Sequence, residues 1–224
     1  MLHLDNSASG FAQVRPPLVR PLLFLDFDDV LCLNTVAGGY DACLAMGQVE
    51  RGSTMENYAN LWQVLFEHSA CAHLRAIDTE FRPVYVLSTS WTRFFDRPSM
   101  TTVLRQCGLG FVADNLHPDA WETPKNGGAR LRAGEISQWL ATQRGSDATV
   151  QAPWVILDDT YSGSGLADWS NRAEAGFIVL CQQGVGLTEL EYQQLRQALV
   201  GRRHTASPPV DADLATDPVI SLES

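Results

Sequence analysis

Short apolar runs recur along the chain, and three of the four clear ones end in polar residues. They lie within residues 21–25, 82–87, 152–157 and 175–180 and are rich in β-branched and aromatic side chains. A run of this length without alternating polar positions is typical of a strand that is buried on both faces of a sheet. We therefore predict four short strands that run parallel to one another.

Apolar residues recur at helical spacing in the intervals between these runs. The pattern predicts helices over 60–80, 99–107, 133–143 and 188–200. Thr188 is placed to cap the last helix, and Glu191, three residues further on, completes a capping box. Strands that alternate with helices form βαβ units, so we predict an α/β fold with a doubly wound parallel sheet and helices on both faces.

The remaining segments lack a strong period. Residues 34–58 are Gly-rich and polar, and we interpret them as a flap or small cap inserted over the end of the first strand. We expect residues 1–20 to be a loose leader and residues 21–200 to form the domain. Residues 201–224 show no core-forming periodicity, so we expect a mobile tail there.

Carboxylates cluster directly after the first apolar run. Asp26 and Asp28 stand two positions apart, and like charges this close are unfavourable unless a cation lies between them. Carboxylate oxygens suit a hard cation, and Mg²⁺ is the natural candidate. The alternative is a turn in which aspartates cap the loop backbone.

Polar residues also follow two other apolar runs. Ser88 and Thr89 come directly after the second run, and Asp158 and Asp159 come directly after the third. Because the carboxyl ends of parallel strands share one edge of a sheet, these clusters can meet there. A hydroxyl and several carboxylates around a cation would form a site for a dianionic phosphoryl group. One of the carboxylates can also act as a nucleophile and form an aspartyl-phosphate.

Composition narrows the class of protein. The net charge of −10 argues against a protein whose main affinity comes from neutralising nucleic-acid phosphates. The chain has no apolar run of about 18 residues, so no membrane-spanning helix is expected. Its first residues lack the apolar region of a secretory signal, and its five cysteines are scattered. We therefore expect reduced thiols and a cytoplasmic location.

The order of these motifs resembles that of the haloacid dehalogenase (HAD) superfamily, whose members are mostly Mg²⁺-dependent phosphohydrolases with a Rossmannoid fold. The motifs are LFLDFDDVL, VYVLS, a basic residue ahead of a helix, and WVILDD, and they cover residues 20–200. The stretches STSW at 88–91 and GLT at 186–188 are similar to those in small-cap HAD domains of bacterial RNA-repair proteins. This resemblance adds polynucleotide 3′- or 5′-phosphatase activity to the candidates.

The resemblance implies a role for each matched residue. Asp26 would be the nucleophile and a metal ligand. Asp28 would be the general acid and then the base, with its backbone carbonyl on the metal. Ser88 would bind a phosphoryl oxygen, Asp159 would complete the Mg²⁺ shell, and Asp158 would be a ligand or its partner.

The basic residue of the third motif stays open at this point. Lys125, Arg130 and Arg132 all precede the helix that begins near residue 133. We place Lys125 first as the catalytic cation, because lysine is the commoner residue type there, and Arg132 among the substrate-binding residues. Thr89 and Trp91 are further substrate-binding candidates, although a tryptophan in such a loop is at least as often a packing residue.

Several alternatives remain beside a Mg²⁺-dependent phosphomonoesterase. A dehalogenase would use Asp26 on carbon, but such enzymes lack the second aspartate. A phospho-signalling receiver would need an aspartate where the second strand ends in Ser88. A HAD-fold binding or interaction protein without activity is the third. The expected partner is a phosphorylated small molecule or nucleic-acid end, with no membrane and no obligate protein partner evident. Asp29 replaces a residue that is usually Gly or small, and it would either weaken phosphate binding or face outward.

Overall fold

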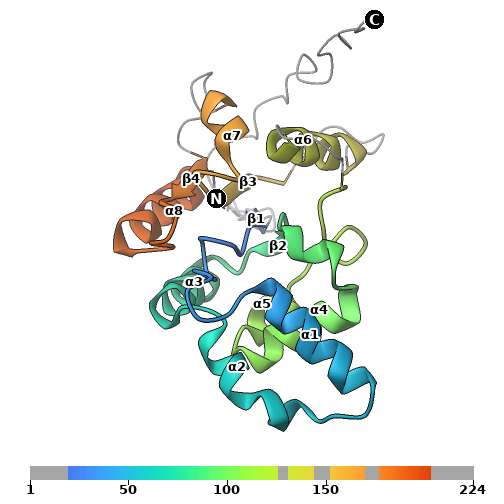
Figure 1. Ribbon diagram of the computed structural model, residues 1–224. Coiled ribbons are helices and arrows are strands. Elements are labelled where there is room, and N and C mark those ends of the chain that lie inside the picture. The colour runs from blue at the N-terminus through green and yellow to red at the C-terminus, as the bar shows by residue number, and fades with distance from the viewer. Residues whose placement is uncertain (1–19, 126–130, 144–151, 170–176, 203–224) are drawn as a thin grey trace, which may run out of the picture.

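The sheet at the centre of the molecule has four parallel strands in the order β2-β1-β3-β4 (Figure 1). The computed structural model describes residues 20–125, 131–143, 152–169 and 177–202. The strands are β1 (Leu22–Leu25), β2 (Val84–Leu87), β3 (Trp154–Asp159) and β4 (Ile178–Cys181). The predicted parallel sheet is confirmed, and β3 extends through both aspartates that follow its apolar run.

Helices connect and cover the strands. They are α1 (Gly39–Glu50), α2 (Ala59–Val64), α3 (His68–Phe81), α4 (Arg97–Gln106), α5 (Gly110–Asp114), α6 (Leu131–Gln143), α7 (Ser164–Trp169) and α8 (Glu189–Arg202). Two 3₁₀ turns, η1 (Met55–Tyr58) and η2 (Ser90–Arg93), lie in the loops. Within the described parts of the chain, no helix is long and apolar enough to cross a membrane.

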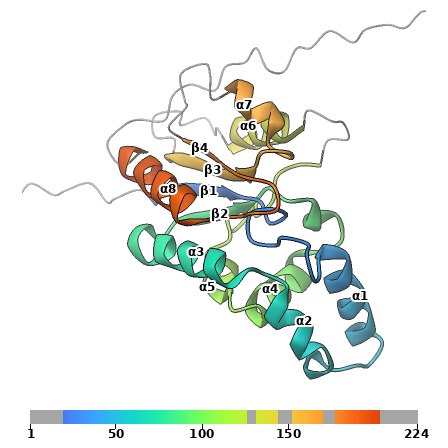
Figure 2. The same ribbon diagram turned by 60° about the vertical axis from the view of Figure 1, so that its left-hand side comes forward.

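Side chains of the strands alternate between two apolar layers. Leu23 and Leu25 of β1 pack with residues of α3, α4 and α8 on one face, whereas Leu22 and Phe24 pack with α6 and α7 on the other. Figure 2 shows α6 and α7 above the sheet and α3 with α5 beneath it. The predicted doubly wound α/β arrangement is confirmed.

Some predicted boundaries are wrong. The helix expected over 60–80 is divided into α2 and α3, because Glu67 has extended backbone and its carboxylate accepts the backbone N–H of Ala70 at 3.0 Å as the cap of α3. Thr188 caps α8 as predicted, since its Oγ1 accepts the N–H of Leu190 at 3.3 Å, and Glu191 forms its half of the capping box by accepting the N–H of Thr188 at 3.1 Å. This helix continues through Arg202, two residues into the segment assigned to the tail. Residues 1–19 and 203–224 lie outside the described residues.

The segment 34–58 contains helix α1, where we expected a flap without strong periodicity. Its buried positions are Gly39, Ala42, Ala45 and Met46, which are at helical spacing. Most of these side chains are small, so the apolar stripe is weak in the sequence. The helix lies with α2 at one end of the molecule, beyond the sheet (Figure 1).

Candidate active site

Hydrogen bonds between strands bring Asp26, Ser88 and Asp158 side by side at the carboxyl edge of the sheet. The last residue of β1 is in register with the last residue of β2 and with Leu157 of β3. One position further, the backbone N–H of Asp26 donates to the carbonyl of Leu157 at 3.0 Å, and that of Ser88 donates to the carbonyl of Leu25 at 2.9 Å. The sheet register therefore assembles the three side chains.

Strand alternation also sets the direction in which these side chains point. Phe24, Val86 and Ile156 belong to the apolar layer under α6 and α7. The residues two positions later face the same side, because side chains alternate with a period of two. Asp26, Ser88 and Asp158 are therefore directed toward α6.

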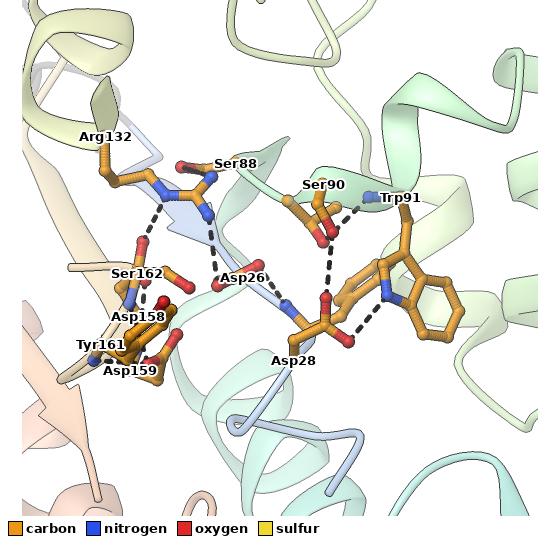
Figure 3. Close-up of polar contacts among 12 residues, drawn as sticks. Asp26, Asp28, Ser88, Ser90, Trp91, Arg132, Asp158, Asp159, Tyr161 and Ser162 are labelled. Carbon is orange, nitrogen blue, oxygen red and sulfur yellow. Dashed lines mark hydrogen bonds and ion pairs between the residues drawn. The ribbon is translucent and has the colours of Figure 1, made fainter. Parts of the chain in front are cut away.

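Arg132, in the first turn of α6, contacts all three of these side chains (Figure 3). Its Nη2 lies 3.2 Å from Asp26 Oδ2, its Nη1 donates to Ser88 Oγ at 3.0 Å, and its Nε lies 2.9 Å from Asp158 Oδ2. The side chain is 9% exposed, and its planar guanidinium fork suits several oxygen partners at once. Arg132 thus ties the ends of three strands together.

Three buried carboxylates form the acidic part of the site. One oxygen from each of Asp26, Asp158 and Asp159 lies within 4.8 Å of the others. Asp159 Oδ1 accepts the backbone N–H groups of Tyr161 and Ser162 at 2.6 and 3.0 Å. Its Oδ2 is buried and has no hydrogen-bond partner within the described chain. An orphaned carboxylate oxygen beside two others fits a hard divalent cation, which favours oxygen ligands.

Burial dominates the ionisation of this cluster. It raises the pKa of Asp26 to about 6, although the positive charge of the Arg132 guanidinium lowers this pKa. Burial, followed by the Asp26 carboxylate, raises the pKa of Asp158 well above its usual range. Burial lowers the pKa of Arg132, but the carboxylates of Asp158 and Asp26 raise it, and the net shift is upward. Three carboxylates around one guanidinium leave negative charge that a cation would neutralise.

Asp28 lies outside the three-carboxylate group and has its own set of donors. Its Oδ1 accepts from Asn34 Nδ2 and from Trp91 Nε1, each at 3.0 Å. Its Oδ2 accepts from Ser90 Oγ at 3.0 Å (Figure 3). The side chain is therefore held at the site without facing the other carboxylates.

The two other basic candidates of the third motif are placed differently. Lys125 Nζ pairs with Glu122 Oε2 at 3.0 Å and donates to the carbonyl of Thr92, and its side chain is 40% exposed. Arg130 lies outside the described residues. The contacts of Arg132 with Asp26 and Ser88 are those that the third-motif cation requires, so the geometry favours Arg132 over Lys125.

The substrate-binding candidates Thr89 and Trp91 are both buried. Thr89 Oγ1 caps the turn η2 by accepting the N–H of Trp91 at 3.4 Å. The indole of Trp91 is 1% exposed and stacks on Phe66 with ring centroids 5.4 Å apart. It therefore packs in the core and bonds Asp28, and it presents no face on which a nucleotide could stack.

Asp29 faces away from the acidic cluster, and its Oδ1 accepts the N–H of Gly184 at 2.9 Å. Its backbone has a φ of 55°, a conformation that glycine adopts freely and aspartate tolerates. This accounts for the small residue expected at the position. The outward alternative is the one that the structure supports.

A cavity of about 620 Å³ opens beside these residues, and its walls carry many hydroxyl groups and two exposed cations. It is lined by Thr89, Ser90, Thr92, Arg93, Thr123, Lys125, Arg132, Glu135, Thr160, Tyr161, Ser162 and Ser164. Donors of this number suit a polar, anionic ligand.

Three residues bond charged groups of the site without having been expected there: Ser90, Glu135 and Asn34. Glu135 Oε2 lies 3.9 Å from Arg132 Nη1, and the spacing of three residues along a helix was its only signal. Asn34 donates to Asp28 from the segment interpreted as a flap. No spacing or motif in the sequence pointed to Asn34.

The parallel sheet, the aspartates after β1, the hydroxyl after β2, the cation on α6 and the acidic end of β3 together define a HAD-like α/β protein. The chain belongs to the family described as the HAD domain in Swiss Army Knife RNA repair proteins, whose model matches residues 22–191. This membership supports phosphohydrolase activity in general. No curated protein and no solved structure matches the chain.

Proposed function

We propose that the protein is a Mg²⁺-dependent phosphomonoester hydrolase that works through an aspartyl-phosphate at Asp26. The observation that carries the proposal is the contact of the Arg132 guanidinium with both Asp26 and Ser88, beside the three-carboxylate group. The residues that we propose as nucleophile and as phosphoryl-binding hydroxyl thus both contact the proposed neutralising cation. A protein that only bound ligand would not need this set.

The carboxylates of Asp26 and Asp159 would hold the metal, with Asp158 beside them. The Oδ2 atoms of both residues lack a hydrogen-bond partner within the described chain, but Asp158 Oδ2 is ion-paired with Arg132 Nε at 2.9 Å, so Asp159 suits the role better. When bound, Mg²⁺ supplies positive charge that neutralises phosphoryl oxygens and orients the group. We assign Asp28 a contact with the metal through its backbone carbonyl only.

The chain's own groups carry the two steps. In the first, an Asp26 oxygen forms a bond to phosphorus, the bond to the leaving alcohol breaks, and Asp28 gives that alcohol its proton. In the second, Asp28 takes a proton from water, the water oxygen bonds to phosphorus, and the bond to Asp26 breaks to release phosphate. Ser88 Oγ already accepts from Arg132, so its own proton is available for a phosphoryl oxygen.

The cavity supports a phosphorylated, hydroxyl-bearing substrate. Arg93 and Lys125 give it positive charge although the chain as a whole is strongly negative. The family description names RNA repair proteins, so we propose a nucleotide or a polynucleotide end that carries a phosphate. A cytoplasmic location stays a prediction, and the five cysteines, all free, are consistent with it.

Phosphate release in the presence and absence of Mg²⁺ tests the proposal. The panel runs from p-nitrophenyl phosphate to 3′- and 5′-phosphorylated oligonucleotides, with wild type compared with Asp26→Asn. We expect Mg²⁺-dependent release that the substitution abolishes. Release that survives Asp26→Asn would refute the nucleophile. Absence of release from every substrate would favour the HAD-fold binding protein without activity.

A further inference from the structure

The three donors on Asp28 are not equivalent, and they distinguish its two oxygens. The indole N–H of Trp91 and the amide N–H of Asn34 can only donate, and both are directed at Oδ1. The Ser90 hydroxyl, which bonds Oδ2, can donate or accept. A proton on Asp28 therefore sits on Oδ2, because Oδ1 already accepts from two groups that cannot reverse. Ser90 lines the cavity, so Oδ2 is the oxygen beside the substrate.

The amide of Asn34 is itself oriented. Its Nδ2 faces Asp28 Oδ1, which accepts, and its Oδ1 lies 3.6 Å from the Cys32 thiol, which is also 3.6 Å from the carbonyl of Ala37. Its backbone has a φ of 55°, which asparagine adopts more readily than most residues. Both features place an exposed side chain in one defined direction.

Trp91 is fixed from several sides. Its ring stacks on Phe66 and meets Phe27 edge-on with centroids 5.3 Å apart. A Cβ on Gly39 would lie 2.7 Å from the indole, closer than real side chains approach. The first residue of α1 therefore has to be glycine for the helix to pack against this ring.

Gly38 leaves space for Asn34 in the same way as Gly39 leaves space for Trp91. A Cβ there would lie 2.1 Å from Asn34 Oδ1. The two glycines that open α1 thus make room for the two side chains that bond Asp28 Oδ1. The start of the small cap is built around this carboxylate.

We propose that Trp91 is a positioning residue that, together with Asn34, holds Asp28 Oδ1 so that Oδ2 delivers the proton to the leaving alcohol. The inference rests on the proposed function, since it assigns a task within that reaction. In this role Trp91 contacts neither substrate nor metal and acts only through its hydrogen bond to Asp28.

The leaving group distinguishes this role from simple packing. Nitrophenolate departs without a proton, whereas an alkoxide needs the general acid. With Trp91→Phe, which keeps an aromatic ring and removes the N–H, we expect the single-turnover rate of alcohol release from propyl phosphate to fall by about 10- to 100-fold. For p-nitrophenyl phosphate we expect the single-turnover release of nitrophenolate to fall by less than about threefold, because the later hydrolysis step, in which Asp28 acts as base, does not enter this measurement. Asp28→Asn should show the same selectivity more strongly.

Trp62→Phe is the matched control, because this buried tryptophan donates its indole N–H to the carbonyl of Met55 and not to Asp28. It should leave the ratio of the two rates unchanged. Asn34→Ala removes the second donor from an exposed position and should repeat the selectivity if Trp91→Phe fails to fold. In the Asp28→Asn background, Trp91→Phe should add less than about threefold, because residues acting through one group are not additive.

The outcomes separate the two proposals. An equal loss on both substrates, or a full additional loss in the Asp28→Asn background, would refute the positioning role while leaving the phosphatase intact. Wild-type protein without Asp26-dependent phosphate release would refute the proposed function itself, and this inference would fall with it.

Discussion

At the scale of single residues, Arg132 makes the contacts that join the three strand ends. Strand alternation directs Asp26, Ser88 and Asp158 toward α6, so a cation that meets all three has to come from that helix. Lys125 comes from the segment between α5 and α6 and has partners of its own. Residue type alone favoured Lys125 as the third-motif cation, whereas the direction in which the strand side chains point favours Arg132.

Substitution of the two cations should therefore give unequal effects. We expect Arg132→Ala to lower kcat/KM by about 10²- to 10³-fold, the usual effect of removing a preorganised charge partner of the transition state. Lys125→Ala should change it by less than about threefold, because an exposed ion pair is worth roughly 0–1 kcal/mol. Steady-state kinetics on p-nitrophenyl phosphate with Mg²⁺ compare the two. A larger loss for Lys125→Ala would return the third-motif role to the lysine.

His117 gives the fold a dependence on pH. Its Nδ1 accepts the N–H of Ala120 at 3.1 Å, and burial lowers the pKa of His117 below its ordinary value of 6.5. Folding therefore favours the neutral ring, and its contribution is complete above pH 6.5 and is lost as pH falls through the lowered pKa. We expect the urea midpoint of wild type to fall between neutral pH and about pH 5 more than that of His117→Asn, which keeps an acceptor that does not titrate. An equal fall of the urea midpoint with pH in wild type and in His117→Asn would contradict this role of His117.

At the scale of elements, strands were easier to predict than the cap. The four strands are continuous apolar runs, and Thr188 with Glu191 marks the start of α8 plainly. Helix α1 was missed because its buried face is made of glycine, alanine and one methionine. The start of the helix places Gly38 against Asn34 and Gly39 against Trp91, which is a property of packing and not of periodicity.

Glycine substitutions within α1 test that packing. Gly39→Ala places a Cβ 2.7 Å from the Trp91 ring, so we expect a loss of about 1–3 kcal/mol in the free energy of unfolding. Gly47→Ala meets only the end of the Arg51 side chain at 3.7 Å and should instead stabilise the helix by up to about 1 kcal/mol. Denaturant unfolding measures both. Equal effects of the two substitutions would show that α1 does not pack against Trp91 as described.

At the scale of the whole molecule, a metal ion would couple β1 to β3 through their carboxylates. Ligand at 100 times its Kd stabilises a folded protein by about 2.7 kcal/mol, which for this length corresponds to a rise of roughly 5–10 °C in Tm. We expect Mg²⁺ to raise the Tm of wild type and not of Asp159→Asn. Asp29→Asn is the control, since its carboxylate bonds Gly184 outside the acidic cluster. A Mg²⁺-dependent rise that persists in Asp159→Asn would contradict the assigned ligand.

The sequence predicted the edge at which the site forms, and the fold was needed to arrange it. Asp26, Ser88 and Asp159 follow apolar strands, and parallel strands end at one edge. The partners of Asp28 are different, because Asn34 and Trp91 reach it only through the packing of the cap. A hydrogen bond between segments that are distant in the sequence, such as that from the indole N–H of a buried tryptophan, leaves no periodic signal in a single sequence.

The most direct test of the account is to trap the covalent intermediate. Protein quenched during turnover with Mg²⁺ and substrate is treated with borohydride, which reduces an acyl-phosphate to an alcohol. We predict homoserine at position 26 by peptide mass spectrometry, in wild type and only when substrate is present. Turnover at full rate with Asp26 unmodified, or reduction at another carboxylate, would contradict the central claim.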